Sequence, residues 1–207
     1  MDAFTRLEAV AVPLDLPNVD TDRIIPARFL HKPTGPGYER YLFHDVRFDA
    51  NGSEKPDFIL NQAPYRAARI LVAGDNFGCG SSREHAVWAL HAHGFRAFIA
   101  PSFGDIFFGS CGKNGTLPIV LPAETVAGIR RQLHARPGAT MVVDLPSQTV
   151  TGPDGARHEF AVDPFRKECL LTGQDEIALT LGHEAAIAAF EAKRDVESPW
   201  LVPGKRA

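Results

Sequence analysis

Apolar residues in this chain gather in short runs that alternate with longer amphipathic stretches. Residues 6–14 alternate weakly between apolar and polar positions, which predicts a strand. Near-continuous apolar runs, typical of strands buried on both faces, follow at 68–73, 95–100 and 117–122. Helical patterns occupy the gaps between these runs, at about 83–93 and 102–110. Strand and helix alternating with short links predict parallel crossovers, and therefore an α/β sheet in the middle of the chain.

The remaining stretches are predicted from turn residues and composition. Proline and glycine residues predict loops at 31–41 and 49–56. A helix is expected over 123–136. Residues 140–145 and 157–162 flank a Pro-Asp-Gly turn at 153–155 and are expected to form antiparallel strands. Residues 174–194 are rich in Ala, Glu and Leu and predict helices that end the fold. We expect one domain over 1–207, with a mobile tail at about 195–207.

Composition limits the classes of protein to which this chain can belong. The chain has 207 residues, of which 44% are hydrophobic and 23% charged, with a net charge of -3. This balance excludes a strongly basic nucleic-acid binder and a polyacidic tail. The N-terminal region lacks an apolar stretch of signal-peptide length, and no run of 18 apolar residues occurs in the sequence. We therefore expect a cytoplasmic protein that binds neither membrane nor nucleic acid.

Cysteine and histidine spacing gives little sign of a metal site. Cys79, Cys111 and Cys169 are far apart and form no Cys-x-x-Cys pair, so neither a zinc ribbon, nor a disulfide framework, nor a cluster is indicated. His91 and His93 lie two apart on a predicted helix and point to different faces. We expect no metal bound by this chain.

The most informative segment is GDNFGCGSSREHA, from Gly74 to Ala86, between a predicted strand and a predicted helix. It is not a P-loop, because Ser81 and not lysine follows the last glycine. It is not a dinucleotide fingerprint, because Arg83 stands where the third glycine is needed. It also lacks the glycine of a nucleophile elbow after Ser81.

Two compatible interpretations of this segment remain. Ser81 and Glu84 match the capping-box pattern, so Ser81, or Ser82 in its place, could cap the helix. Alternatively, the helix N-terminus and Arg83 could bind a carboxylate, and the same donors could stabilise a serine alkoxide. Upstream, Asp20 and Asp22 could form a turn with Asx hydrogen bonds, or orient a serine or a partner's base.

Four segments together resemble a known family: NVDTDRIIPARFL, YLFHDVRF, GDNFGCGSSREHAVWAL and IAPSFGDIFFGS. They are similar to the small subunits of 3-isopropylmalate dehydratases of the bacterial long form, in the aconitase superfamily. The resemblance runs from about residue 4 to residue 194, and GSSREHA is its most specific part.

The resemblance implies a swivelling β/β/α domain like the C-terminal, fourth domain of aconitase. It implies a hydro-lyase of leucine biosynthesis that converts 2-isopropylmalate to 3-isopropylmalate through 2-isopropylmaleate, by dehydration and rehydration. A [4Fe-4S] cluster would be bound by a large subunit and not by this chain. The two subunits would form a heterodimer or heterotetramer that is active only when complete.

The resemblance also implies roles for individual residues. Ser81 matches the serine that takes the substrate proton, and Asp22 matches an active-site aspartate. Ser82 and Arg83 match groups that hold the substrate carboxylate. The segment between Asp22 and Tyr41 selects the substrate in relatives, and Leu30, Tyr38 and Tyr41 are our own candidates there for contact with an apolar substituent.

One stretch departs from the family pattern. Long-form relatives often carry an arginine in the loop that here reads PTGPGYE, from Pro33 to Glu39. Another 2-hydroxy dicarboxylate, such as a methylated malate or homoaconitate, therefore stays open as the substrate. Two further alternatives are a stand-alone hydrolase that uses Ser81 or Cys79, and a binding module in which the glycine loop only caps a helix.

Overall fold

The protein is described by a computed structural model, which covers residues 1–201 and divides into two compact units, Met1–Gly173 and Gln174 onward. In the first unit one seven-stranded sheet has the order β4-β3-β2-β1-β5-β6-β7. Its strands are β1 (Arg6–Leu14), β2 (Ile70–Ala73), β3 (Ala97–Ala100), β4 (Leu117–Val120), β5 (Thr140–Asp144), β6 (Thr149–Thr151) and β7 (Arg157–Glu159). Strands β1 to β4 pair in parallel and β5 to β7 in antiparallel fashion, so the predicted α/β sheet is confirmed.

The helices of the first unit are α1 (Thr21–Ile24), α2 (His44–Arg47), α3 (Glu84–His93), α4 (Asp105–Lys113), α5 (Ala123–Ala135) and α6 (Pro164–Thr172). Helix α3 ends at Gly94, whose φ of 108° lies in the left-handed region that glycine tolerates best. The predicted helices at 83–93, 102–110 and 123–136 correspond to α3, α4 and α5.

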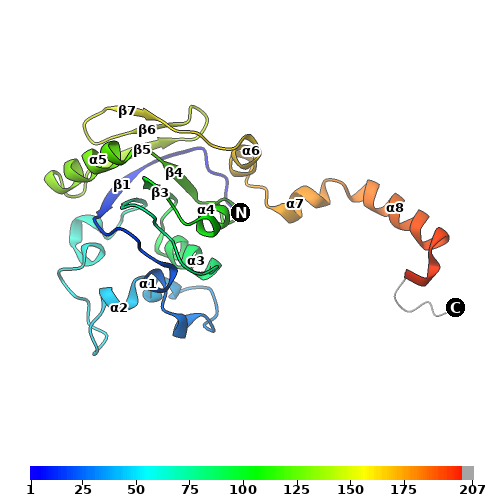
Figure 1. Cartoon of the computed structure of the whole chain (residues 1–207), viewed down its shortest axis with the longest axis horizontal. Coiled ribbons are helices and arrows are strands. Elements are labelled where there is room, and N and C mark those ends of the chain that lie inside the picture. The colour runs from blue at the N-terminus through cyan, green and yellow to red at the C-terminus, as the bar shows by residue number, and fades with distance from the viewer. Residues whose placement is uncertain (202–207) are drawn as a thin grey trace. The chain divides into compact units, whose positions relative to one another are not determined.

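Two hydrophobic clusters cover the two faces of the sheet. Because side chains alternate along a strand, Leu71 and Ala73 join one cluster while Ile70 and Val72 join the other. The first cluster contains α3 and the chain between β1 and β2, and the second contains α5 and the antiparallel strands. Figure 1 shows this division, with α5 beside β5 and β6, and with α1 and α3 on the other side of β1.

The antiparallel part differs from the prediction. Strand β6 was not expected, and the Pro-Asp-Gly turn joins β6 to β7 instead of joining β5 to β7. Strand β5 pairs with β1 on one side and β6 on the other. The three residues of β6 make too short a run for a pattern to show, and pairing with two neighbours stabilises them.

The second unit consists of α7 (Glu176–Leu181), α8 (Glu184–Glu197) and a 3-10 turn at Pro199–Leu201. Helices at the end of the chain are therefore confirmed. Residues 195–197, expected in the mobile tail, form the last part of α8, while residues 202–207 lie outside the described part. The single domain over 1–207 stays a prediction. Among residues 1–201, no helix is both long and apolar enough to cross a membrane.

Candidate active site

Three loops meet at the carboxyl ends of β1, β2 and β3, the edge at which parallel sheets usually bind ligands. The loop after β1 reaches the loop after β2 through the Asn18 N–H, which donates to the Asp75 carbonyl at 2.8 Å. The loop after β3 joins them through the Phe77 N–H, which donates to the Ser102 carbonyl at 3.1 Å. Bridges of β type pair Asp20 with Cys79 and Phe77 with Phe103.

Side chains reinforce this junction. The Ser102 hydroxyl donates to the Asp75 carboxylate at 2.5 Å and accepts from the Asn76 N–H at 2.9 Å. The Asn76 amide donates to the Asn18 side-chain oxygen at 2.8 Å. Asn18 and Asn76 both have positive φ, at 51° and 55°, a conformation that asparagine adopts more readily than most residues. The loop that carries Ser81 is therefore anchored at its base by the two neighbouring loops.

Glycine is required where this loop packs most closely. Gly78 has a φ of +73°, and a Cβ atom there would lie 2.3 Å from Cγ of Phe107. A Cβ atom at Gly104 would lie 2.5 Å from the Gly78 carbonyl oxygen. These contacts press the loop onto α4, so its path to Ser81 is fixed by packing.

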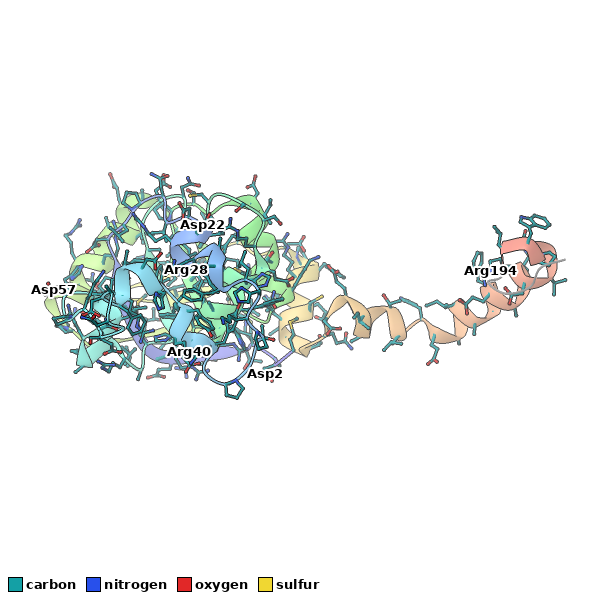
Figure 2. All side chains as sticks on the ribbon, turned by 90° about the horizontal axis from the view of Figure 1, so that it is seen from below. Asp2, Asp22, Arg28, Arg40, Asp57 and Arg194 are labelled. Carbon is teal, nitrogen blue, oxygen red and sulfur yellow. The ribbon has the colours of Figure 1, made fainter. Side chains whose placement is uncertain are left out.

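The first two residues of α1, Thr21 and Asp22, contact Ser81 and Arg83 of the serine loop. Asp20 caps α1, since its carboxylate accepts from the Arg23 N–H at 2.6 Å, which confirms the turn interpretation for this residue. The Thr21 hydroxyl donates to the Ser81 carbonyl at 3.1 Å. Asp22 forms an ion pair with Arg83. The structure thus brings Asp22 against Arg83, two residues after Ser81, while the catalytic and binding roles of these residues stay predictions. Figure 2 labels Asp22 on the compact first unit.

The start of α3 differs from the capping prediction. The residue that precedes the helix is Arg83, and neither Ser81 nor Ser82 caps it. The Glu84 carboxylate accepts from the Asn114 amide at 2.8 Å instead of returning to Ser81. Both serines are exposed, while the Arg83 side chain is only 20% exposed. The two serines thus directly precede Arg83 and the amino end of α3, a helix end at which an anion is stabilised.

The three predicted apolar contacts lie in or beside the first core cluster. Tyr38 is 2% and Tyr41 8% exposed, and their rings meet edge to face at 5.5 Å. Leu30 is half-buried against the same cluster. Burial raises the pKa of Tyr38 above its ordinary value, and the nearby Tyr41 adds to the shift. Contact of these three side chains with a substrate stays a prediction.

Thr21, Asn18, Asn76 and Ser102 were not singled out from the sequence. Each acts through a backbone or amide contact with a residue distant in the chain, and such contacts leave no local pattern. Asn18 and Asn76 offered the one sequence signal, because asparagine in a turn adopts positive φ more readily than most residues.

A sheet whose parallel strands end at a serine loop, with an arginine at the start of the next helix, defines a domain of the aconitase C-terminal type. The family model of the aconitase C-terminal domain matches residues 1–124. A model described as the C-terminal domain of the 3-isopropylmalate dehydratase small subunit matches residues 176–204. The chain belongs to the family of 3-isopropylmalate dehydratase small subunits.

Full-length relatives support this membership. The 3-isopropylmalate dehydratase small subunit of Paramagnetospirillum magneticum is 54% identical over 97% of this chain and 100% of its own length. That of Leptospira interrogans is 53% identical, over 97% of this chain and 98% of its own. A crystal structure of 3-isopropylmalate dehydratase from Methanocaldococcus jannaschii superposes with a TM-score of 0.64. It is 23% identical and covers 89% of this chain and 98% of its own, which supports the fold.

Membership in the aconitase family implies an iron–sulfur cluster, and the donor groups of this chain do not fit one. Cys111 is fully buried within α4, where burial raises the pKa of its thiol far above the ordinary value. Cys79 lies in the serine loop and Cys169 in α6, so the three thiols belong to separate elements. Among residues 1–201, no three His, Cys, Asp or Glu side chains are grouped so as to hold a metal ion.

Proposed function

We propose that this chain is the small subunit of 3-isopropylmalate dehydratase, and that it works with a large subunit in leucine biosynthesis. The complex would isomerise 2-isopropylmalate to 3-isopropylmalate through 2-isopropylmaleate. The observation that carries the proposal is the group formed by Ser81, Arg83 and Asp22 at the amino end of α3. The names of the full-length relatives agree with it.

In this proposal Ser81 is the base. Its Oγ takes the proton from the carbon next to a carboxylate while hydroxide leaves the neighbouring carbon, which gives the alkene. In the second half, water adds with the positions of hydroxyl and hydrogen exchanged. Serine is a weak base, so its alkoxide needs strong stabilisation, and the amino end of α3 with Arg83 supports that need.

Arg83 and Ser82 are proposed to hold the substrate carboxylate. A guanidinium group presents two parallel N–H donors that match the two oxygens of a carboxylate. Asp22 pairs with the same guanidinium group and thereby limits its orientation. We propose that Asp22 serves catalysis in this way, with its charge close to the reacting groups.

The exposure of the serines supports a partner. Ser81 and Ser82 are exposed to solvent in this chain, whereas alkoxide stabilisation is strongest where water is excluded. A large subunit that closes over this edge would exclude water and complete the site. We assign the iron–sulfur cluster to that subunit because the cysteines here are separated, and we propose a cytoplasmic heterodimer or heterotetramer.

A related 2-hydroxy dicarboxylate is the second candidate substrate. The loop from Pro33 to Glu39 lacks the arginine that long-form relatives often carry there. Gly35 in this loop is exposed, whereas Tyr38 near its end is buried. A ligand at the loop would therefore meet the exposed backbone around Gly35 before it met the Tyr38 side chain. A methylated malate or homoaconitate could fit the same carboxylate site.

A stand-alone hydrolase is less well supported. Such an enzyme needs a base beside its nucleophile, and among the described residues no histidine hydrogen-bonds to Ser81 or Cys79. A pure binding module would leave the pairing of Asp22 with Arg83 without a chemical role.

The test is reconstitution with the large subunit. The chain alone should be colourless and inactive, and the anaerobic complex should convert 2-isopropylmalate. A panel containing a methylated malate and homoaconitate then separates the two substrate classes. Turnover by the chain alone would contradict the proposal, as would a complex inactive on every 2-hydroxy dicarboxylate.

A further inference from the structure

Thr21 is a buried threonine that binds the serine loop at two points. The residue is 2% exposed, and its hydroxyl donates to the Ser81 carbonyl at 3.1 Å. Its backbone N–H donates to the Cys79 carbonyl at 2.9 Å. The two bonds lie on either side of Gly80, so Thr21 spans the residue at which the loop can rotate most freely.

Gly80 makes this restraint necessary. Its φ of +96° is one that glycine adopts readily. A Cβ atom at this position would lie 3.4 Å or more from the neighbouring atoms. The packing around Gly80 therefore restrains the backbone less than it does at Gly78. Without the hydroxyl of Thr21, the peptide that follows Ser81 could turn about this point.

The bond to the Ser81 carbonyl also sets the direction of another group. The peptide between Ser81 and Ser82 is planar and trans, so its carbonyl and its N–H point in opposite directions. Because the carbonyl faces Thr21, the N–H of Ser82 faces away from it. An N–H held in advance of the reaction stabilises developing negative charge without further reorganisation.

We propose that Thr21 is a positioning residue, whose hydroxyl orients the Ser81–Ser82 peptide so that the Ser82 N–H is presented to the charge that develops during proton transfer. The inference rests on the proposed function of Ser81 as the base. It adds a residue that touches neither substrate nor cofactor but sets the geometry of the group that does.

Three variants test the role in the reconstituted complex. Thr21→Val removes the hydroxyl and keeps the branched shape, whereas Thr21→Ser keeps the hydroxyl. Thr116→Val is the matched control. Thr116, between α4 and β4, is also buried, and its hydroxyl donates to the carbonyl of Cys111 in α4 at 3.0 Å.

We expect Thr21→Val to lower kcat roughly 10- to 100-fold, less than the loss from deleting an oxyanion donor outright, with KM changed little. Thr21→Ser should recover most of kcat, and Thr116→Val should keep kcat while lowering the urea midpoint. Wild-type kcat in Thr21→Val would overturn the inference. So would an equal loss in Thr21→Ser, which would point to the methyl group.

A second measurement separates this inference from the proposed function. The NMR order parameter of the Ser82 N–H in the full-length chain alone needs no partner and no turnover, and it reports how firmly this exposed N–H is held in one direction. Thr21→Val should lower this order parameter, and Thr116→Val should leave it unchanged. If the wild-type complex were inactive, the proposed function would fail while the order parameter still decided whether Thr21 orders the peptide; a wild-type order parameter in Thr21→Val would refute that.

Discussion

Asp22 carries the charge that pairs with Arg83, and this ion pair ties α1 to the residue that precedes α3. The two side chains differ in exposure, at 54% for Asp22 and 20% for Arg83. Exposed ion pairs contribute little to stability, usually below about 1 kcal/mol. The pair is therefore better suited to orienting the guanidinium group than to holding the fold together.

Replacing Asp22 should affect the reaction more than the fold. We expect Asp22→Asn to lower kcat/KM by about 10- to 100-fold, because Arg83 loses the charge that orients it. The free energy of unfolding should change by less than about 1 kcal/mol. Steady-state kinetics of the complex and urea unfolding of the chain measure the two effects.

Asp45→Asn provides the matched control for this comparison. Asp45 pairs with Arg28, and its side chain is 56% exposed, close to the 54% of Asp22. Its removal should leave the kinetics at wild-type values. Equal kinetic losses in the two variants would show that Asp22 has no special relation to the site.

Ser81→Ala should abolish most of the turnover while the complex still assembles. The side chain is exposed in this chain and its hydroxyl is not needed to cap α3, so the fold loses little. Loss of a general base lowers kcat by roughly 10²- to 10⁴-fold. Gel filtration checks assembly, and anaerobic assays measure kcat and KM.

Ser82→Ala serves as the comparison for Ser81. Because Ser82 is proposed to hold the carboxylate, its removal should mainly raise KM. If Ser81→Ala kept wild-type turnover, another group would have to be the base.

The parallel sheet could be predicted because its strands are local runs of apolar residues. Ile70 to Ala73 are buried on both faces, so every position in the run is apolar. The region between β1 and β2 could not be predicted in the same way, since its short helical turns depend on distant contacts. Arg47, for example, is buried because its guanidinium group donates to the Asn61 side chain at 2.8 Å.

The candidate site likewise has residues that could be predicted from the sequence and residues that could not. Ser81 and Arg83 stand in a glycine-rich segment that can be recognised, and their proximity to Asp22 followed from the family resemblance. The capping prediction for Ser81 was wrong because Glu84 bonds to Asn114 at the end of α4, which no local spacing could reveal. The role of Thr21 could not be predicted, because a hydroxyl that donates to a carbonyl distant in the chain produces no local sequence pattern.

Gly78→Ala should destabilise the first unit strongly. The new Cβ atom would meet the Phe107 ring at 2.3 Å, and a φ of +73° strains any residue with a side chain. Steric overlap and backbone strain each cost about 1–3 kcal/mol, so a loss of about 3 kcal/mol or more is expected in urea unfolding.

Gly52→Ala separates the cost of backbone strain from the cost of steric overlap. Gly52 has a φ of +81° but nothing within 4 Å of the added atom, so only the backbone strain of about 1 kcal/mol should appear. Similar losses in both variants would show that Phe107 moves aside freely and that the loop is not pressed onto α4.

His93 should make the stability of the chain depend on pH. Burial, together with the charge of Arg47 and against the opposing effect of Glu39, lowers the pKa of His93 to about 4. Its ordinary pKa is 6.5, so between pH 4 and 6.5 the unfolded chain binds more protons than the folded chain, and stability rises with pH. The contribution is fully present above pH 6.5 and is lost as the pH falls toward 4, by about 3 kcal/mol in total.

Urea unfolding at a series of pH values tests this dependence against two variants. His93→Gln should flatten the slope between pH 4 and 6.5, because the group that must stay neutral in the fold is gone. His31→Gln replaces an exposed histidine and should keep the wild-type slope. The imidazole Nε2 of His93 is buried and, within the described residues, makes no hydrogen bond, so a proton there would have no acceptor. A wild-type slope in His93→Gln would assign the pH dependence to another group, with His91, whose pKa burial also lowers, as the next to replace.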